Sequence, residues 1–178
     1  MSKSKIIYLH GYGSSPSSEK VKSLQEHFDV YAPNVPLLFD EAFESLITEL
    51  KNLKSLDVVL VGTSLGGYWA SLLSEMFKIP AIIINPSCSP NKTLAKYKNV
   101  ALTDLELSKY KDLDLKSSVP RIVLLAEDDE ILDYRIAEQL FKPIAEVKLF
   151  ESGGHRFNEV EIIAKYIIEL QNYSIYLP

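Results

Sequence analysis

Apolar residues occur along this chain in two patterns, short continuous runs and longer stretches with apolar residues on one helical face. Continuous runs rich in Val, Ile and Leu are typical of strands that are buried on both faces of a parallel sheet. Such runs predict six strands, at residues 5–9, 29–32, 57–61, 80–85, 120–126 and 145–150.

Segments with helical spacing separate most of these strands and predict helices that cover the sheet. Ser15 and Pro16 are expected to begin the first helix, and Asp40 to cap the second. Asn158 and Glu161 resemble a capping box for the last helix. The apolar helical faces are Val21, Leu24 and Phe28; Phe43, Leu46, Ile47, Leu50 and Leu53; Leu65, Trp69, Leu72, Leu73 and Met76; residues 134–141; and Val160, Ile163, Ile167 and Leu170. This alternation predicts a three-layer α/β fold, with mostly parallel strands in the order 2-1-3-4-5-6.

Residues 87–119 interrupt the alternation of strands and helices. The segment is rich in Lys, Ser, Asp and Leu and contains no clear strand. We expect a short helical insertion that acts as a lid over the strand ends, within a single domain of residues 1–178. Its apolar residues are expected to line the pocket for a substrate's acyl group. Lys92, Lys96 and Lys98 could meet an anionic head group, although three such lysines more often form a solvated face.

Composition and charge narrow the class of protein. The net charge of −5 argues against nucleic acid or an anionic membrane as a partner. The single cysteine, Cys88, excludes an internal disulfide and a cysteine-based zinc site. The chain shows neither a signal peptide nor a stretch of transmembrane length. With 178 residues, it is expected to be a cytoplasmic monomer or weak homo-oligomer.

The pentapeptide Gly62-Thr63-Ser64-Leu65-Gly66 joins an apolar strand to an amphipathic helix. This is the sequence and the context of the G-x-S-x-G nucleophile elbow, in which a serine stands on a sharp turn at a strand end. Gly62 and Gly66 would flank Ser64 because side chains there would block the close approach of strand and helix. Ser64 is therefore the predicted nucleophile.

A serine nucleophile needs a base within hydrogen-bonding reach and an acid that orients this base. His155 follows the last predicted strand and is the predicted base. The acidic run at residues 127–130 follows the fifth strand, where Asp129 is the preferred acid and Asp128 is the alternative. The carboxyl ends of parallel strands meet at one edge of a sheet, so we expect these groups to gather around Ser64.

The developing oxyanion needs two backbone N–H donors. Leu65 supplies the first by its position after the nucleophile, and Tyr12, in the loop after the first strand, is the expected second donor. His10 is expected to shape this loop through hydrogen bonds, and Gly11 to allow its tight turn.

Phosphate-binding and metal-binding interpretations of these motifs fail. A dinucleotide fingerprint would need a third glycine after Gly11 and Gly13, but Pro16 stands in its place. The glycines of residues 62–67 are not followed by the Gly-Lys-Ser/Thr of a phosphate loop. No helical pair of histidines suggests a metal, so we expect neither a metal nor a cofactor.

Motifs at residues 9–16, 62–68, 85–86, 129–134 and 153–157 together resemble the small bacterial YqiA-type esterases of the α/β-hydrolase superfamily. The resemblance extends over nearly the whole chain. It implies the α/β-hydrolase fold and an esterase that cleaves acyl esters or acyl-CoA thioesters. It also favours Asp129 over Asp128, because Asp129 matches the family's Asp-Glu-x-Leu-Asp-Tyr run.

The sequence thus predicts a serine hydrolase that cleaves a small carboxylic ester or acyl-CoA thioester through an acyl-enzyme. The alternative is a binding protein on a hydrolase fold with little or no turnover. A flavodoxin-like binding domain is less consistent, because it would leave the glycine turn and His155 unexplained.

Overall fold

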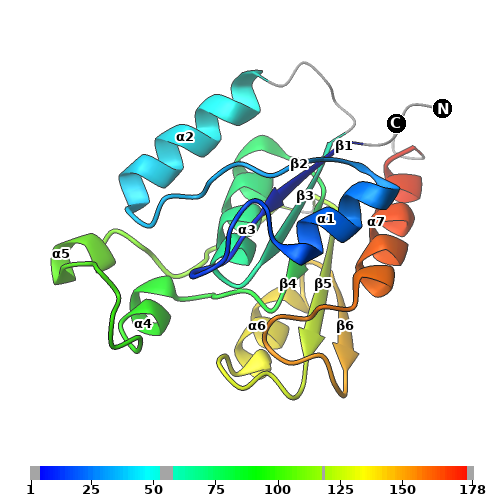
Figure 1. The fold of residues 1–178 in the computed structure, drawn as a ribbon. Coiled ribbons are helices and arrows are strands. Elements are labelled where there is room, and N and C mark those ends of the chain that lie inside the picture. Colours follow the sequence, from blue (N-terminus) through cyan, green and yellow to red (C-terminus); the bar gives the residue numbers. More distant parts are fainter. Residues whose placement is uncertain (1–4, 53–57, 118, 176–178) are drawn as a thin grey trace.

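The computed structural model describes residues 5–52, 58–117 and 119–175, in which a sheet lies between layers of helices (Figure 1). The strands in these ranges are β1 (Lys5–Leu9), β2 (Asp29–Tyr31), β3 (Val58–Thr63), β4 (Ala81–Ile84), β5 (Arg121–Ala126) and β6 (Glu146–Phe150). The helices are α1 (Glu19–His27), α2 (Phe39–Asn52), α3 (Leu65–Phe77), α4 (Pro90–Leu94), α5 (Asp104–Leu107), α6 (Tyr134–Phe141) and α7 (Val160–Ile175).

All strand pairings in the described part of the chain are parallel, and the spatial order is β2-β1-β3-β4-β5-β6. The predicted strand order is therefore confirmed. In register, Leu9 at the end of β1 lies opposite Gly62 in β3, and Ala126 at the end of β5 lies opposite Phe150 in β6. The loops that follow these strands consequently open at the same edge of the sheet.

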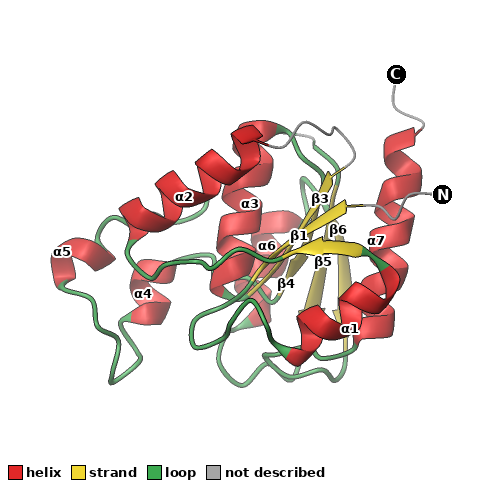
Figure 2. Ribbon diagram, turned by 45° about the horizontal axis from the view of Figure 1, so that its top comes forward, coloured by secondary structure: helices red, strands yellow, loops and turns green. Residues whose placement is uncertain are grey.

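Successive side chains of each strand enter two different cores, because they point to opposite faces of the sheet. Ile7, Leu60 and Ile83 pack on the face that α2, α3 and α6 cover. Ile6 and Val61 pack on the opposite face, against α1 and α7. Burial on both faces explains why the strand sequences are continuously apolar. The prediction of three layers is confirmed (Figure 2).

The first helix begins later than the sequence suggested. Ser18 is the N-cap of α1, and its hydroxyl accepts a hydrogen bond from a backbone N–H of the first turn. Ser15 and Pro16 precede the helix because they belong to a separate turn, in which the Ser18 N–H donates to the Ser15 carbonyl at 3.3 Å. The prediction that Ser15 and Pro16 begin α1 is therefore wrong.

Two other helix boundaries also differ from the prediction. Asp40 lies inside the first turn of α2, because that helix begins at Phe39. The last helix begins at Val160, two residues after Asn158. The predicted helical position Leu53 and the predicted strand position Asp57 lie outside the described residues.

Within the described ranges, no helix has both the length and the apolar character that a membrane crossing requires.

The described part of the 87–119 segment contains the short helices α4 and α5 and packs against α2 and α3. Tyr110 is fully buried, lies against the rings of Phe39 and Trp69, and donates a hydrogen bond from its hydroxyl to the Leu37 carbonyl at 2.9 Å. Leu94 and the leucines after Tyr110 belong to the same core. The segment is thus a packed part of the domain's core.

Candidate active site

Ser64 stands at the junction of β3 and α3 with a φ of 59° and a ψ of −120°. A positive φ is unfavourable for a residue with a side chain and costs on the order of 1–3 kcal/mol, so surrounding contacts must hold it. The Ser64 N–H donates to the Ile84 carbonyl at 3.0 Å, and its carbonyl accepts the N–H groups of Tyr68 and Ser87. This strained turn lifts the Ser64 hydroxyl out of the sheet.

The glycines on either side of Ser64 allow the backbone segments to approach closely. A Cβ at Gly62 would lie 2.1 Å from the Gly66 carbonyl oxygen, and a Cβ at Gly66 would lie 1.9 Å from the Leu9 carbonyl oxygen. Gly11 approaches from the other side, where a Cβ would lie 3.1 Å from the Cβ of Ser64. Gly62 and Gly66 are thus required by the space that is left around the elbow, whereas a Cβ at Gly11 would make a tight contact.

Replacing Gly66 with alanine should destabilise the protein by at least about 3 kcal/mol, because the added methyl group meets backbone that cannot move aside. Urea denaturation followed by circular dichroism measures this loss. Met76→Ala, at the exposed end of the same helix, is the control and should change the unfolding free energy by less than about 1 kcal/mol. Stability equal to wild type in the Gly66 variant would contradict the tight packing of the elbow.

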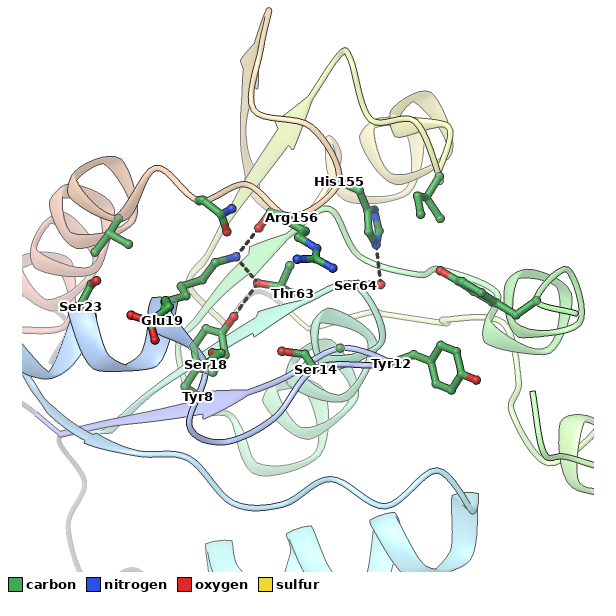
Figure 3. A pocket seen from close by; sticks show the side chains of 17 residues that line it. Tyr8, Tyr12, Ser14, Ser18, Glu19, Ser23, Thr63, Ser64, His155 and Arg156 are labelled. Atoms are coloured by element: carbon green, nitrogen blue, oxygen red, sulfur yellow. Dashed lines mark hydrogen bonds between the residues drawn. The ribbon is translucent and has the colours of Figure 1, made fainter. Parts of the chain in front are cut away.

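The side chains of Ser64, His155 and Asp129 form a continuous hydrogen-bonded chain. The Ser64 Oγ lies 2.9 Å from His155 Nε2 (Figure 3). On the other side of the ring, His155 Nδ1 lies 2.9 Å and 3.0 Å from the two Asp129 oxygens. An ionised carboxylate only accepts, so Nδ1 carries the proton and Nε2 is free to accept from the serine hydroxyl. The Asp129 side chain is 1% exposed and that of His155 is 11% exposed.

Three consecutive carboxylates after β5 hold the loop that carries His155. Asp129 contacts the imidazole, whereas Asp128 accepts the Gly154 N–H at 2.8 Å. Glu130 accepts the N–H of His155 itself at 2.9 Å, and this hydrogen bond lowers the pKa of the Glu130 carboxyl. Of the two acids that the sequence left open, only Asp129 contacts the ring.

Asn85, at the end of β4, is a further residue that fixes the histidine loop. Its amide nitrogen donates to the carbonyls of Gly154 and His155 at 2.9 Å and 3.1 Å, and its oxygen accepts the Ala126 N–H at 2.9 Å. Asn85 also has a positive φ of 39°. The sequence alone predicts no role for Asn85, although its position before Pro86 at a strand end is a signal.

The loop after β1 passes beside Ser64. His10 accepts the Val35 N–H at its Nε2 and donates from Nδ1 to the Gly11 carbonyl, each at 3.1 Å. The N–H groups of Tyr12 and Leu65 are not hydrogen-bonded within the described residues. The N–H of Leu65 is free because the first N–H groups of a helix have no intrahelical partner. Both expected oxyanion donors are thus available.

A cavity of about 650 Å³ opens beside Ser64 and His155 (Figure 3). It extends toward α1 and the start of α7. Its other lining residues include Tyr8, Tyr12, Lys20, Thr63, Tyr97 and Arg156. No group of three or more His, Cys, Asp or Glu side chains within the described ranges is arranged to hold a metal ion.

The leucines and tyrosines of residues 87–119 were expected to line the acyl pocket, but most of the described ones pack in the core instead. Between Ser64 and this segment there is room for only about 10 Å³, because Leu94 and its neighbours fill the space themselves. Among the described residues of the segment, only Tyr97 reaches the cavity beside Ser64 and His155. The exposed Lys92 pairs with Asp112 at 2.9 Å, and none of Lys92, Lys96 and Lys98 lines the cavity. The basic residues at the cavity are instead Lys20 and Arg156.

Solved structures and relatives agree with this architecture. The structure superposes on alpha/beta hydrolase domain-containing protein 10 from mouse with a TM-score of 0.74 and 16% identity, covering 95% of this chain and 90% of that one. It superposes on the esterase Pf2001 of Pyrococcus furiosus with a TM-score of 0.69 and 18% identity, covering 97% and 82%. The fold is therefore the α/β-hydrolase fold that the sequence predicted.

The match to a relative in sequence covers most of both chains. UPF0227 protein YcfP of Salmonella gallinarum is 27% identical over 173 residues, which covers 87% of this chain and 92% of the relative. The model of the Uncharacterised protein family (UPF0227) matches residues 5–172, and the chain therefore belongs to this family.

Proposed function

We propose that the protein is a serine esterase that hydrolyses small carboxylic esters, with thioesters as a further class of substrate. The observation that carries this proposal is the hydrogen-bonded chain from Ser64 through His155 to Asp129, placed at the mouth of a cavity. The names of the structural neighbours, which include an esterase and an α/β-hydrolase-domain protein, support the same reaction class.

In the first half of the proposed reaction, Ser64 Oγ attacks the carbonyl carbon of the ester while its proton passes to His155 Nε2. The N–H groups of Tyr12 and Leu65 stabilise the oxyanion, and Asp129 stabilises the charged imidazole. The intermediate then expels the alcohol, or the thiol of a thioester, which takes the proton back from His155. The acyl group remains bonded to Ser64.

In the second half, water attacks the acyl carbon and gives its proton to His155 Nε2. The tetrahedral intermediate expels Ser64 Oγ, which recovers this proton, and the carboxylic acid leaves. Each half needs the same base and the same oxyanion donors. Because no redox step occurs, this mechanism requires no cofactor.

A fluorophosphonate probe tests the proposal and separates an enzyme from a binding protein on the same fold. We expect wild-type protein to gain one covalent adduct on the peptide that contains Ser64, because His155 activates the hydroxyl for attack on phosphorus, with loss of fluoride. Intact-mass and peptide mass spectrometry measure this adduct. The Ser64→Ala protein should not react.

An unlabelled wild-type protein would support the binding-protein alternative and contradict the esterase proposal. Equal labelling of the Ser64→Ala protein would show that another group reacts. Once labelling is established, a panel of esters and acyl-CoA thioesters of graded chain length distinguishes the two classes of leaving group.

A further inference from the structure

Lys20 places a buried ammonium group at the cavity without a carboxylate partner. The residue is 9% exposed, and its Nζ donates to the Arg156 carbonyl and to the Thr63 hydroxyl, the latter at 3.5 Å. Thr63 Oγ1 is also hydrogen-bonded to the Tyr8 hydroxyl at 3.1 Å. These partners are all neutral, although a buried charge is usually paired with an opposite charge.

Arg156 adds a second cation to the same cavity. It follows His155 directly, and its side chain lies among the residues that line the cavity beside Thr63 and Ser64 (Figure 3). Burial, and the nearby charge of Arg156, lower the pKa of Lys20 to about 8. Within the described residues, neither Lys20 nor Arg156 forms an ion pair with a carboxylate.

The carboxylates near the cavity have other partners. Glu19 lines the cavity but pairs with Lys22 on the exposed side of α1 at 2.6 Å. Asp129 contacts the imidazole of His155, and Glu130 accepts the N–H of the same residue. The two cations at the cavity therefore remain uncompensated, in the space next to the nucleophile.

We propose that the preferred substrate is an ester with a carboxylate or phosphate group on its acyl or alcohol part, and that Lys20 and Arg156 bind this anion in the cavity beside Ser64. The charge and hydrogen-bonding capacity of an ammonium and a guanidinium group suit such an anion. The inference rests on the proposed esterase function, because it specifies the substrate that Ser64 attacks.

Binding to the Ser64→Ala protein tests the anion site without requiring turnover. Isothermal titration at constant low salt compares monomethyl adipate with dimethyl adipate, which is neutral and of similar size. A second pair, 4-acetoxybenzoate and its methyl ester, places the anion on the alcohol part. We expect the anionic member of at least one pair to bind at least tenfold more tightly than its neutral partner. The pair that shows this difference identifies whether the acyl part or the alcohol part of the preferred substrate carries the charge.

Lys20→Met and Arg156→Gln, each in the Ser64→Ala background, should reduce this preference to less than about threefold. Arg156 is exposed, so its variant remains informative even if replacement of the buried Lys20 disturbs folding. Lys142→Met is the control, since Lys142 is exposed and neither it nor its partner Glu138 lines the cavity; it should leave the preference unchanged.

Equal binding of both members of both pairs would overturn the anion site, as would a preference that persists in the Lys20 and Arg156 variants. If wild-type protein hydrolyses neutral and anionic esters equally well, the esterase function holds and the anion site fails. Selective binding of anions by a protein that hydrolyses no ester supports the anion site and contradicts the esterase function.

Discussion

Ser64→Ala should abolish ester hydrolysis, lowering kcat by about 10⁶-fold, because the loss of a serine nucleophile leaves only binding and oxyanion stabilisation. The substitution removes a single oxygen, whose hydrogen bond is to His155 Nε2. The unfolding free energy should therefore change by less than about 1 kcal/mol. Steady-state kinetics on a 4-nitrophenyl ester, together with urea denaturation, measure both effects.

Ser87→Ala is the matched control for this substitution. Ser87 is a buried serine close to the elbow, and its hydroxyl is hydrogen-bonded to Thr93 Oγ1 at 2.6 Å. Its loss should lower kcat by less than about tenfold, because it takes no part in proton transfer. If Ser64→Ala retained most of the activity, Ser64 would not be the nucleophile.

Asp129→Asn should lower kcat by about 10⁴-fold with little change in structure. An amide can donate to His155 Nδ1 and thereby favour the tautomer in which Nε2 carries the proton, which prevents the histidine from accepting the proton of Ser64. The hydrogen bonds from the N–H groups of Ile131 and Leu132 to Asp129 Oδ1 can be made equally well to the amide oxygen.

Asp128→Asn tests the neighbouring acid that the sequence could not exclude. Asp128 accepts the Gly154 N–H, and an asparagine oxygen can accept the same hydrogen bond. The kcat of the Asp128→Asn protein should therefore fall by less than about tenfold. If instead Asp128→Asn were the more damaging substitution, the assignment of Asp129 as the orienting acid would be wrong.

The fold could be predicted in detail because its signals are local. Each strand is a continuous apolar run, and parallel strands with helical crossovers permit few arrangements. The Gly-x-Ser-x-Gly turn and the order of serine, acid and histidine then placed Ser64, Asp129 and His155 at one edge of the sheet. Helix starts were less certain, since both Ser15 and Ser18 are capable of capping, and a turn from Ser15 to Ser18 places the start of α1 after the second serine.

The cavity could not be predicted, because it depends on which side chains fill space over long sequence separations. The leucines of residues 87–119 are compatible with a pocket wall or with a packed core, and the burial of Tyr110 and Leu94 decides for the core. Lys20 directly precedes Val21 in α1, and nothing in the sequence indicated that this lysine would be buried. Its contact with the Arg156 carbonyl joins residues 136 positions apart.

The histidine loop is held from several directions, by Asn85, Asp128 and Glu130 on its backbone and by Asp129 on the ring. Conformational entropy that would otherwise be lost when the imidazole is positioned is therefore lost once, during folding. It does not recur as part of the activation barrier in each proposed catalytic cycle. In thermodynamic terms, contacts made by the surrounding loops place the base before any substrate arrives.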